Sequence, residues 1–155
     1  MNAREESAAA LVRRAREDAG MSQRELADRA GLKQPNLAAI ESGAREPSSE
    51  LLSRILRAAR LRPSIPLELF ASRIRALGPR YGVSNIRVFG SAARGTDTER
   101  SDVDLLVNAG DQVDFLTLAA FREEVAGILG FPVDAVVDDP DDEIVRVIRR
   151  EAVPL

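Results

Sequence analysis

Residues 90–107 read GSAARGTDTERSDVDLLV, and they are the most informative part of the second half of the chain. It follows residues 86–89 (IRVF), which alternate as a β-strand does. A Gly-Ser turn and a polar loop then lead to a second apolar strand that carries Asp102 and Asp104. Because side chains alternate across a strand, these two carboxylates point to one face, about 6 to 7 Å apart. Val103 and Leu105 point to the opposite face and the core.

Two carboxylates on one strand face indicate a site for a hard cation. Mg²⁺ takes oxygen ligands and completes its shell with water and substrate phosphates, so a pair of Asp side chains is a typical protein contribution. Gly90 lets the backbone approach a phosphate, and Ser91 offers an N–H and a hydroxyl there. Asp134 lies in an apolar strand, residues 131–137 (FPVDAVV), where a charge is costly unless it is paired or bound to metal. If this strand lies beside that of Asp104, the three carboxylates can hold two magnesium ions.

Helical periodicity surrounds these strands. Apolar spacing predicts helices within residues 70–81, over residues 114–129, and from residues 139–140 (DP) onward. We therefore expect an α/β domain with a small mixed sheet flanked by helices. Three acidic residues outside the predicted elements are interpreted as solvated loop charges: Asp97, Glu99 and Asp111.

The composition excludes several kinds of chemistry. The chain has 155 residues, 45% of them hydrophobic, and contains neither His nor Cys, which excludes His/Cys zinc sites, disulfides, thiol catalysis and a Ser-His-Asp triad. Lys33 is the only lysine and lies outside any Walker motif, which excludes P-loop and Schiff-base chemistry. The charged start lacks a signal-peptide core and no apolar run approaches a membrane span, so a cytoplasmic location without a membrane partner is expected.

Charge divides the chain into two parts. Residues 1–66 hold 12 basic and 9 acidic residues, whereas residues 67–155 hold 10 basic and 16 acidic, within a total net charge of −3. A basic first part and an acidic second part suggest two domains with different partners. The two prolines of residues 62–66 (RPSIP) mark the boundary. We expect a first domain over residues 1–62, a linker over 63–66 and a second domain over 67–155.

The first domain is predicted to be all-α, with four to five helices. Apolar spacing predicts a first helix over about residues 6–19. Ser22 and Glu25 form a capping box that starts a second helix, and a third spans residues 33–42. A fourth opens at residues 47–48. Two short helices joined by a tight turn and braced by outer helices form a helix-turn-helix.

The run over residues 22–55, SQRELADRAGLKQPNLAAIESGAREPSSELLSRI, resembles the Xre/Cro type of helix-turn-helix, and the resemblance covers roughly residues 8–61. It implies operator DNA as a partner, with the third helix in the major groove. The residues it places at base edges are Lys33, Gln34, Asn36 and Ala39, and those near phosphates are Gln23 and Arg45. The alternative is a protein-interaction module in which Gln34 and Asn36 are solvated.

The Gly-Ser pair, the ten residues after it and the Asp-x-Asp pair resemble the DNA polymerase β-like nucleotidyltransferases, in particular their minimal (MNT) class, over roughly residues 67–150. The resemblance implies magnesium-dependent transfer of a nucleoside monophosphate, with ATP as the substrate and two Mg²⁺ ions as cofactors. The expected catalytic and metal-binding residues are Asp102, Asp104 and Asp134, of which Asp134 also takes the acceptor proton. The expected nucleotide-binding residues are Gly90, Ser91 and Arg94, although Arg94 is equally well explained as a structural residue.

The acceptor is expected to be a protein, because the chain lacks the extra helical domain with which larger members of that family hold their acceptors. It is similar to the antitoxins of MNT-HEPN toxin-antitoxin pairs, which implies adenylylation of a tyrosine in a HEPN-like toxin, autoregulation at the operator, and assembly as a homodimer or with the toxin. Two alternatives stay open. One is a DNA-binding regulator whose nucleotidyltransferase fold acts only as nucleotide sensor or toxin-docking surface, and the other is a small-molecule (antibiotic) nucleotidyltransferase.

Overall fold

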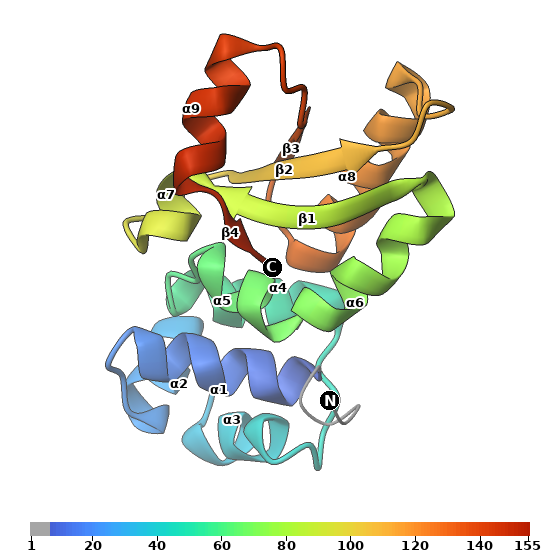
Figure 1. The fold of residues 1–155 in the computed structure, drawn as a ribbon. Helices are drawn as coiled ribbons and strands as arrows, with labels where there is room; N and C mark the ends of the chain where they lie inside the picture. The colour runs from blue at the N-terminus through green and yellow to red at the C-terminus, as the bar shows by residue number, and fades with distance from the viewer. Residues whose placement is uncertain (1–6) are drawn as a thin grey trace.

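A computed structural model describes residues 7–155 and consists of a helical N-terminal domain packed against an α/β domain (Figure 1). The N-terminal helices are α1 (Ala8–Asp18), α2 (Gln23–Ala30), α3 (Gln34–Glu41) and α4 (Ser49–Ala58). The predicted helix-turn-helix arrangement is therefore confirmed. The expected start of the first helix, at residue 6, lies outside the described residues.

Local sequence explains where these helices begin and end. The Ser22 side chain accepts the Glu25 N–H and the Glu25 side chain accepts the Ser22 N–H, so the predicted capping box is present. Gly31 ends α2 in the left-handed conformation, with φ of 68°. Between α1 and α3, the buried carboxylate of Glu41 on α3 accepts hydrogen bonds of 2.7 and 3.0 Å from the Arg16 guanidinium on α1. This ion pair joins the two helices beside the apolar core of the domain.

The segment expected as a linker is helical. Residues 63–66 lead into and form the start of α5 (Ser64–Leu69), which is followed by α6 (Ala71–Leu77) and a 3₁₀ turn, η1 (Gly78–Tyr81). Proline is tolerated in the first turn of a helix, where the missing N–H has no partner to lose. The two domains are thus connected by a helix that is buried on its apolar side.

Arg62 and Asp97 join the two domains. The Asp97 carboxylate has no exposed side-chain surface and accepts hydrogen bonds from Arg62 Nη1 (2.9 Å) and the Ser64 N–H (2.7 Å). Arg62 also donates two bonds of 2.9 Å to Asp18 on α1. The interpretation of Asp97 as a solvated charge is therefore wrong, because the start of α5 covers this loop and its carboxylate is paired.

The C-terminal domain is built on a mixed sheet with the strand order β3-β2-β1-β4. The strands are β1 (Val83–Phe89), β2 (Val103–Ala109), β3 (Val133–Val137) and β4 (Val153–Pro154). β1 is antiparallel to β2 and β4, whereas β2 and β3 are parallel. Between β1 and β2 the Gly-Ser segment forms a short helix, α7 (Gly90–Arg94), where the sequence predicted only a turn.

Helices cover both faces of this sheet (Figure 1). α8 (Phe115–Leu129) contributes Phe121 and Val125 to the main core, together with the β2 residues Leu105 and Val107. Asp104 and Leu106 alternate with those β2 residues and therefore point to the other face. That face is the one over which α9 (Glu143–Glu151) lies, as Figure 1 shows.

The start predicted for the last helix is wrong. Residues 139–142 precede α9, because the Asp142 side chain accepts the N–H groups of Ile144 and Val145 and so caps the helix at that point. Among the described residues, no helix combines the length and apolarity that crossing a bilayer requires.

Candidate active site

Three carboxylates meet where β2 and β3 begin. Parallel pairing sets Asp104 beside Asp134, and Asp102 directly precedes β2. One carboxylate oxygen from each residue lies within 4.8 Å of the other two. The structure therefore brings together the three acidic residues that the sequence selected, in a set of oxygen donors that suits a divalent cation.

The three carboxylates differ in exposure and in partners. Partial burial raises the pKa of Asp104, and the negative charges of Asp102 and Asp134 raise it further. The Asp134 side chain is 64% exposed and pairs with Arg122 at 3.0 Å. Asp134 is thus paired, as a charge in an apolar strand was expected to be, but it is not buried among core residues, because β3 is an edge strand. A cation at this cluster would relieve the repulsion between the acids without needing a deep cavity.

Gly90 lies directly against the acidic cluster. Its φ is +72°, and a Cβ placed on it would lie 2.6 Å from Asp104 Oδ2. Both the backbone conformation and the space thus require glycine. The Gly-Ser segment is held so close to the Asp-x-Asp pair that a phosphate at its backbone N–H groups would also reach a cation on the carboxylates.

Glu151 also belongs to this region, and sequence reasoning missed it. Gly90 donates its N–H to Glu151 Oε1 at 3.2 Å, and Arg94 Nη1 donates to Glu151 Oε2 at 2.9 Å. Arg94 therefore lies on the same side of the Gly-Ser segment as the Gly90 N–H. Glu151 is the last residue of α9, and no spacing signal connects it with Gly90, 61 positions earlier in the chain, or with Arg94, 57 positions earlier.

The candidate DNA-binding residues lie on the other domain, at the end of the molecule away from the sheet (Figure 1). Gln34 is exposed at the start of α3, where its amide donates to Gln23 Oε1 at 3.0 Å. Gln23 in turn donates to Glu41 at 3.0 Å, so the Gln23 side chain connects Gln34, the first residue of α3, with Glu41, the last. Lys33 and Arg45 are exposed, and Asn36 and Ala39 are partly exposed. Gln23, Lys33 and Gln34 thus lie together, and the Arg45 N–H donates to the Ala39 carbonyl at 3.1 Å.

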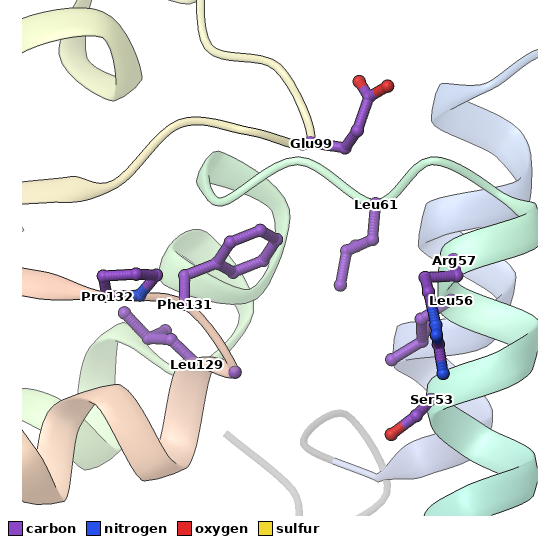
Figure 2. Close-up of a pocket in the computed structure, with 9 residues that line it drawn as sticks. Ser53, Leu56, Arg57, Leu61, Glu99, Leu129, Phe131 and Pro132 are labelled. Atoms are coloured by element: carbon purple, nitrogen blue, oxygen red, sulfur yellow. The ribbon is translucent and has the colours of Figure 1, made fainter.

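A groove of about 560 Å³ separates α4 from the turn between α8 and β3 (Figure 2). Figure 2 shows Leu56 and Arg57 on one wall and Leu129 and Phe131 on the other. Its lining includes neither the acidic cluster nor the Gly-Ser segment. The groove is therefore separate from both candidate sites.

Comparisons with known proteins give each domain a family. Residues 12–65 match the helix-turn-helix family, and residues 67–153 match the nucleotidyltransferase domain. The first part is similar to an uncharacterised HTH-type transcriptional regulator of Mycobacterium tuberculosis, with 43% identity over 51 residues, which are 33% of this chain and 36% of the regulator.

The second part is similar to archaeal proteins and to a solved structure. A protein provisionally named a protein adenylyltransferase in Methanocaldococcus jannaschii is 36% identical over 63 residues, 41% of this chain and 64% of that relative. This chain therefore spans just under two thirds of that relative. Protein adenylyltransferase MntA of Thermococcus cleftensis is 36% identical over 80 residues, 51% of this chain and 81% of MntA.

The solved structure, described as that of a minimal nucleotidyltransferase, is 37% identical, with a TM-score of 0.51 over 57% of this chain and 95% of that one. These matches agree with the mixed sheet and with the Gly-Ser and Asp-x-Asp segments described above. The chain belongs to the nucleotidyltransferase-domain family and carries a helix-turn-helix domain ahead of its nucleotidyltransferase domain.

Proposed function

We propose that this chain transfers AMP from ATP to a hydroxyl group of a partner protein, with magnesium as the cofactor. The observation that carries the proposal is the close approach of Gly90 to the acidic cluster, because a phosphate-binding backbone and a cation site are thereby adjacent. Asp102, Asp104 and Asp134 would hold two magnesium ions. When bound, these ions supply charge stabilisation at the α-phosphate and lower the pKa of the attacking hydroxyl.

The other residues of the site have separate tasks in this scheme. The N–H groups of Gly90 and Ser91 and the Arg94 guanidinium would bind the β- and γ-phosphates. Asp134, the carboxylate with a largely exposed side chain on the edge strand, is open to an incoming acceptor and would take the proton of its hydroxyl. The hydroxyl oxygen then forms a bond to the α-phosphorus, and the bond from that phosphorus to the bridging oxygen of the β-phosphate breaks and releases pyrophosphate.

A protein acceptor suits the exposure of the site. Asp102 and Asp134 are exposed and Asp104 is partly buried, so a large molecule can reach the cluster directly. The relatives named as protein adenylyltransferases support the same choice. We propose a HEPN-like toxin as the partner and one of its tyrosines as the acceptor. The chain would then be a cytoplasmic antitoxin. It would assemble either as a homodimer or in a complex with the toxin.

We further propose that residues 1–62 bind the operator of the same gene pair, while residues 67–155 carry the transferase. Gln34 and Asn36 would read base edges in the major groove, and Gln23 and Arg45 would contact phosphates. Replacing Gln34 and Asn36 together by alanine should weaken operator binding about 30-fold or more, because each lost amide contact to adenine costs roughly 1 kcal/mol or more. Fluorescence anisotropy at a fixed salt concentration measures the affinity for the operator. An unchanged affinity would show that Gln34 and Asn36 do not contact base edges.

One observation favours a second function, that of a DNA-binding regulator which only senses a nucleotide. The Arg62–Asp97 ion pair connects the helical domain to the loop that leads into Asp102, so the two domains share a contact near the site. A regulator of this kind would bind ATP and change its DNA affinity without transferring AMP.

Intact-mass spectrometry separates the two functions. The co-expressed product of the neighbouring gene is incubated with this chain, magnesium and each of the four nucleoside triphosphates, and Asp104→Asn is the control. Among the four nucleoside triphosphates, we expect only ATP to increase the mass of the neighbouring gene's product, by one AMP group. We expect no increase with the Asp104→Asn control. A stable complex with no added mass under any condition would instead support the nucleotide-sensing regulator.

A further inference from the structure

The C-terminal end of α9 contacts the segment that the proposed function assigns to the triphosphate. Both oxygens of the Glu151 carboxylate are engaged, one with the Gly90 N–H at 3.2 Å and the other with Arg94 Nη1 at 2.9 Å. A backbone N–H and a guanidinium are the two kinds of donor that commonly bind phosphate oxygens. The carboxylate oxygens of Glu151 thus stand where phosphate oxygens would be bound.

The position of Glu151 is electrostatically unfavourable apart from these two partners. It is the last residue of α9, and a negative charge at the C-terminal end of a helix is destabilised by the helix dipole. It also adds to the negative charge around Asp104. Gly90 and Arg94 compensate this charge in the chain without nucleotide.

The contact is weak enough to be exchanged. The side chains of Arg94 and Glu151 are 55% and 39% exposed, so water screens their attraction. An exposed pair of this kind changes an equilibrium constant by no more than about fivefold. A triphosphate carries several negative charges and binds together with a cation, and therefore outcompetes a single carboxylate for the same donors.

We propose that Glu151 occupies the triphosphate position of the free chain, competes with the incoming nucleotide for Gly90 and Arg94, and so sets the affinity and selectivity of the nucleotide site. This inference rests on the proposed function of that site. A nucleoside triphosphate displaces Glu151 with its β- and γ-phosphates, whereas a nucleoside monophosphate lacks the groups that would take its place. Glu151 thereby lowers the affinity for triphosphates and leaves the binding of AMP unaffected.

Calorimetric titration of the full chain with a non-reacting ATP analogue and magnesium tests this, at constant ionic strength. Glu151→Gln keeps the shape and removes the charge, Glu151→Ala removes both contacts, and Glu143→Gln at the other end of α9 is the matched control. We expect the Kd for the analogue to fall about two- to fivefold in both Glu151 variants and to stay at the wild-type value in the control. The Kd for AMP should be the same in all four proteins.

Other results would overturn the inference in distinguishable ways. An unchanged or larger Kd for the analogue in Glu151→Gln would mean that Glu151 does not compete, and a larger one would mean that it positions Gly90 and Arg94 for binding. An equal gain for AMP and the analogue would show that Glu151 acts through general charge and not at the triphosphate position. If the wild type and every variant fail to bind the analogue, the proposed function itself fails. Circular dichroism confirms that each variant is folded.

Discussion

Replacing Asp97 with alanine tests whether the contact between the two domains stabilises the protein. The change leaves the Ser64 N–H and one arm of Arg62 without their acceptor. Removing one partner of a buried ion pair costs about 3 to 5 kcal/mol, and a single unpaired buried donor costs about 1 to 3 kcal/mol. Because Arg62 keeps its bonds to Asp18 and its side chain is 30% exposed, we expect a loss between these ranges, about 2 to 4 kcal/mol.

Thermal and urea unfolding followed by circular dichroism measure this loss. For a chain of this size, 2 to 4 kcal/mol corresponds to a fall in Tm of roughly 5 to 15 °C. Glu99→Ala is the control, since Glu99 is exposed on the same loop and should change the free energy of unfolding by less than about 0.5 kcal/mol. Asp97→Asn should lie between the two, because its amide oxygen can still accept the Ser64 N–H. If Asp97→Ala loses no more stability than Glu99→Ala, the assignment of a structural role to this contact is wrong.

Three further outcomes follow from the site and its surroundings. Gly90→Ala should abolish AMP transfer in a folded protein, because the added Cβ would lie 2.6 Å from Asp104 Oδ2 at a φ of +72°; activity near the wild-type level would contradict this. Magnesium at 100 times its Kd should raise the free energy of unfolding of the wild type by about 2.7 kcal/mol, and both EDTA and Asp104→Asn should remove that gain, so equal stabilisation of the variant would count against the cation site. A hydrogen bond from Arg149, then one from Arg87, lowers the pKa of Asp138 below its ordinary value of 3.8. Its contribution to stability is therefore complete above that value and is lost as the pH falls through the lower folded pKa; urea titrations in acid should show a shallower decline for Asp138→Asn, and parallel curves would refute the assignment.

Local signals account for most of what the sequence predicted. The capping box at Ser22 depends on two residues three positions apart. The face shared by Asp102 and Asp104 likewise depends only on a local spacing, that of two positions along a strand. Asp134 was placed beside Asp104 by assuming that their strands are neighbours, which the parallel pairing confirms. Its exposure could not be read from the sequence, because an apolar strand at the edge of a sheet has the same pattern as one in the middle.

The residues that sequence reasoning misjudged are those whose surroundings come from distant parts of the chain. Asp97 lies in a polar loop of the type that is usually solvated, and only the packing of α5 over that loop buries it. Glu151 is the last residue of α9, at the end where the helix dipole disfavours a negative charge. Its contact with Gly90 depends on how α9 lies over the sheet, which no spacing in the sequence encodes.

The helical connection through α5 also has a geometric consequence for any assembly on DNA. Since Arg62 ties α1 to the loop before β2, the direction of α3 is fixed relative to the acidic cluster within one chain. If two chains bind the two halves of a palindromic operator, the spacing of the half-sites along the double helix would set the separation and the relative rotation of the two catalytic faces. The length of DNA between the half-sites would then determine how the two catalytic faces are oriented relative to each other. Inserting half a helical turn of DNA between the half-sites would place the two faces on opposite sides of the duplex.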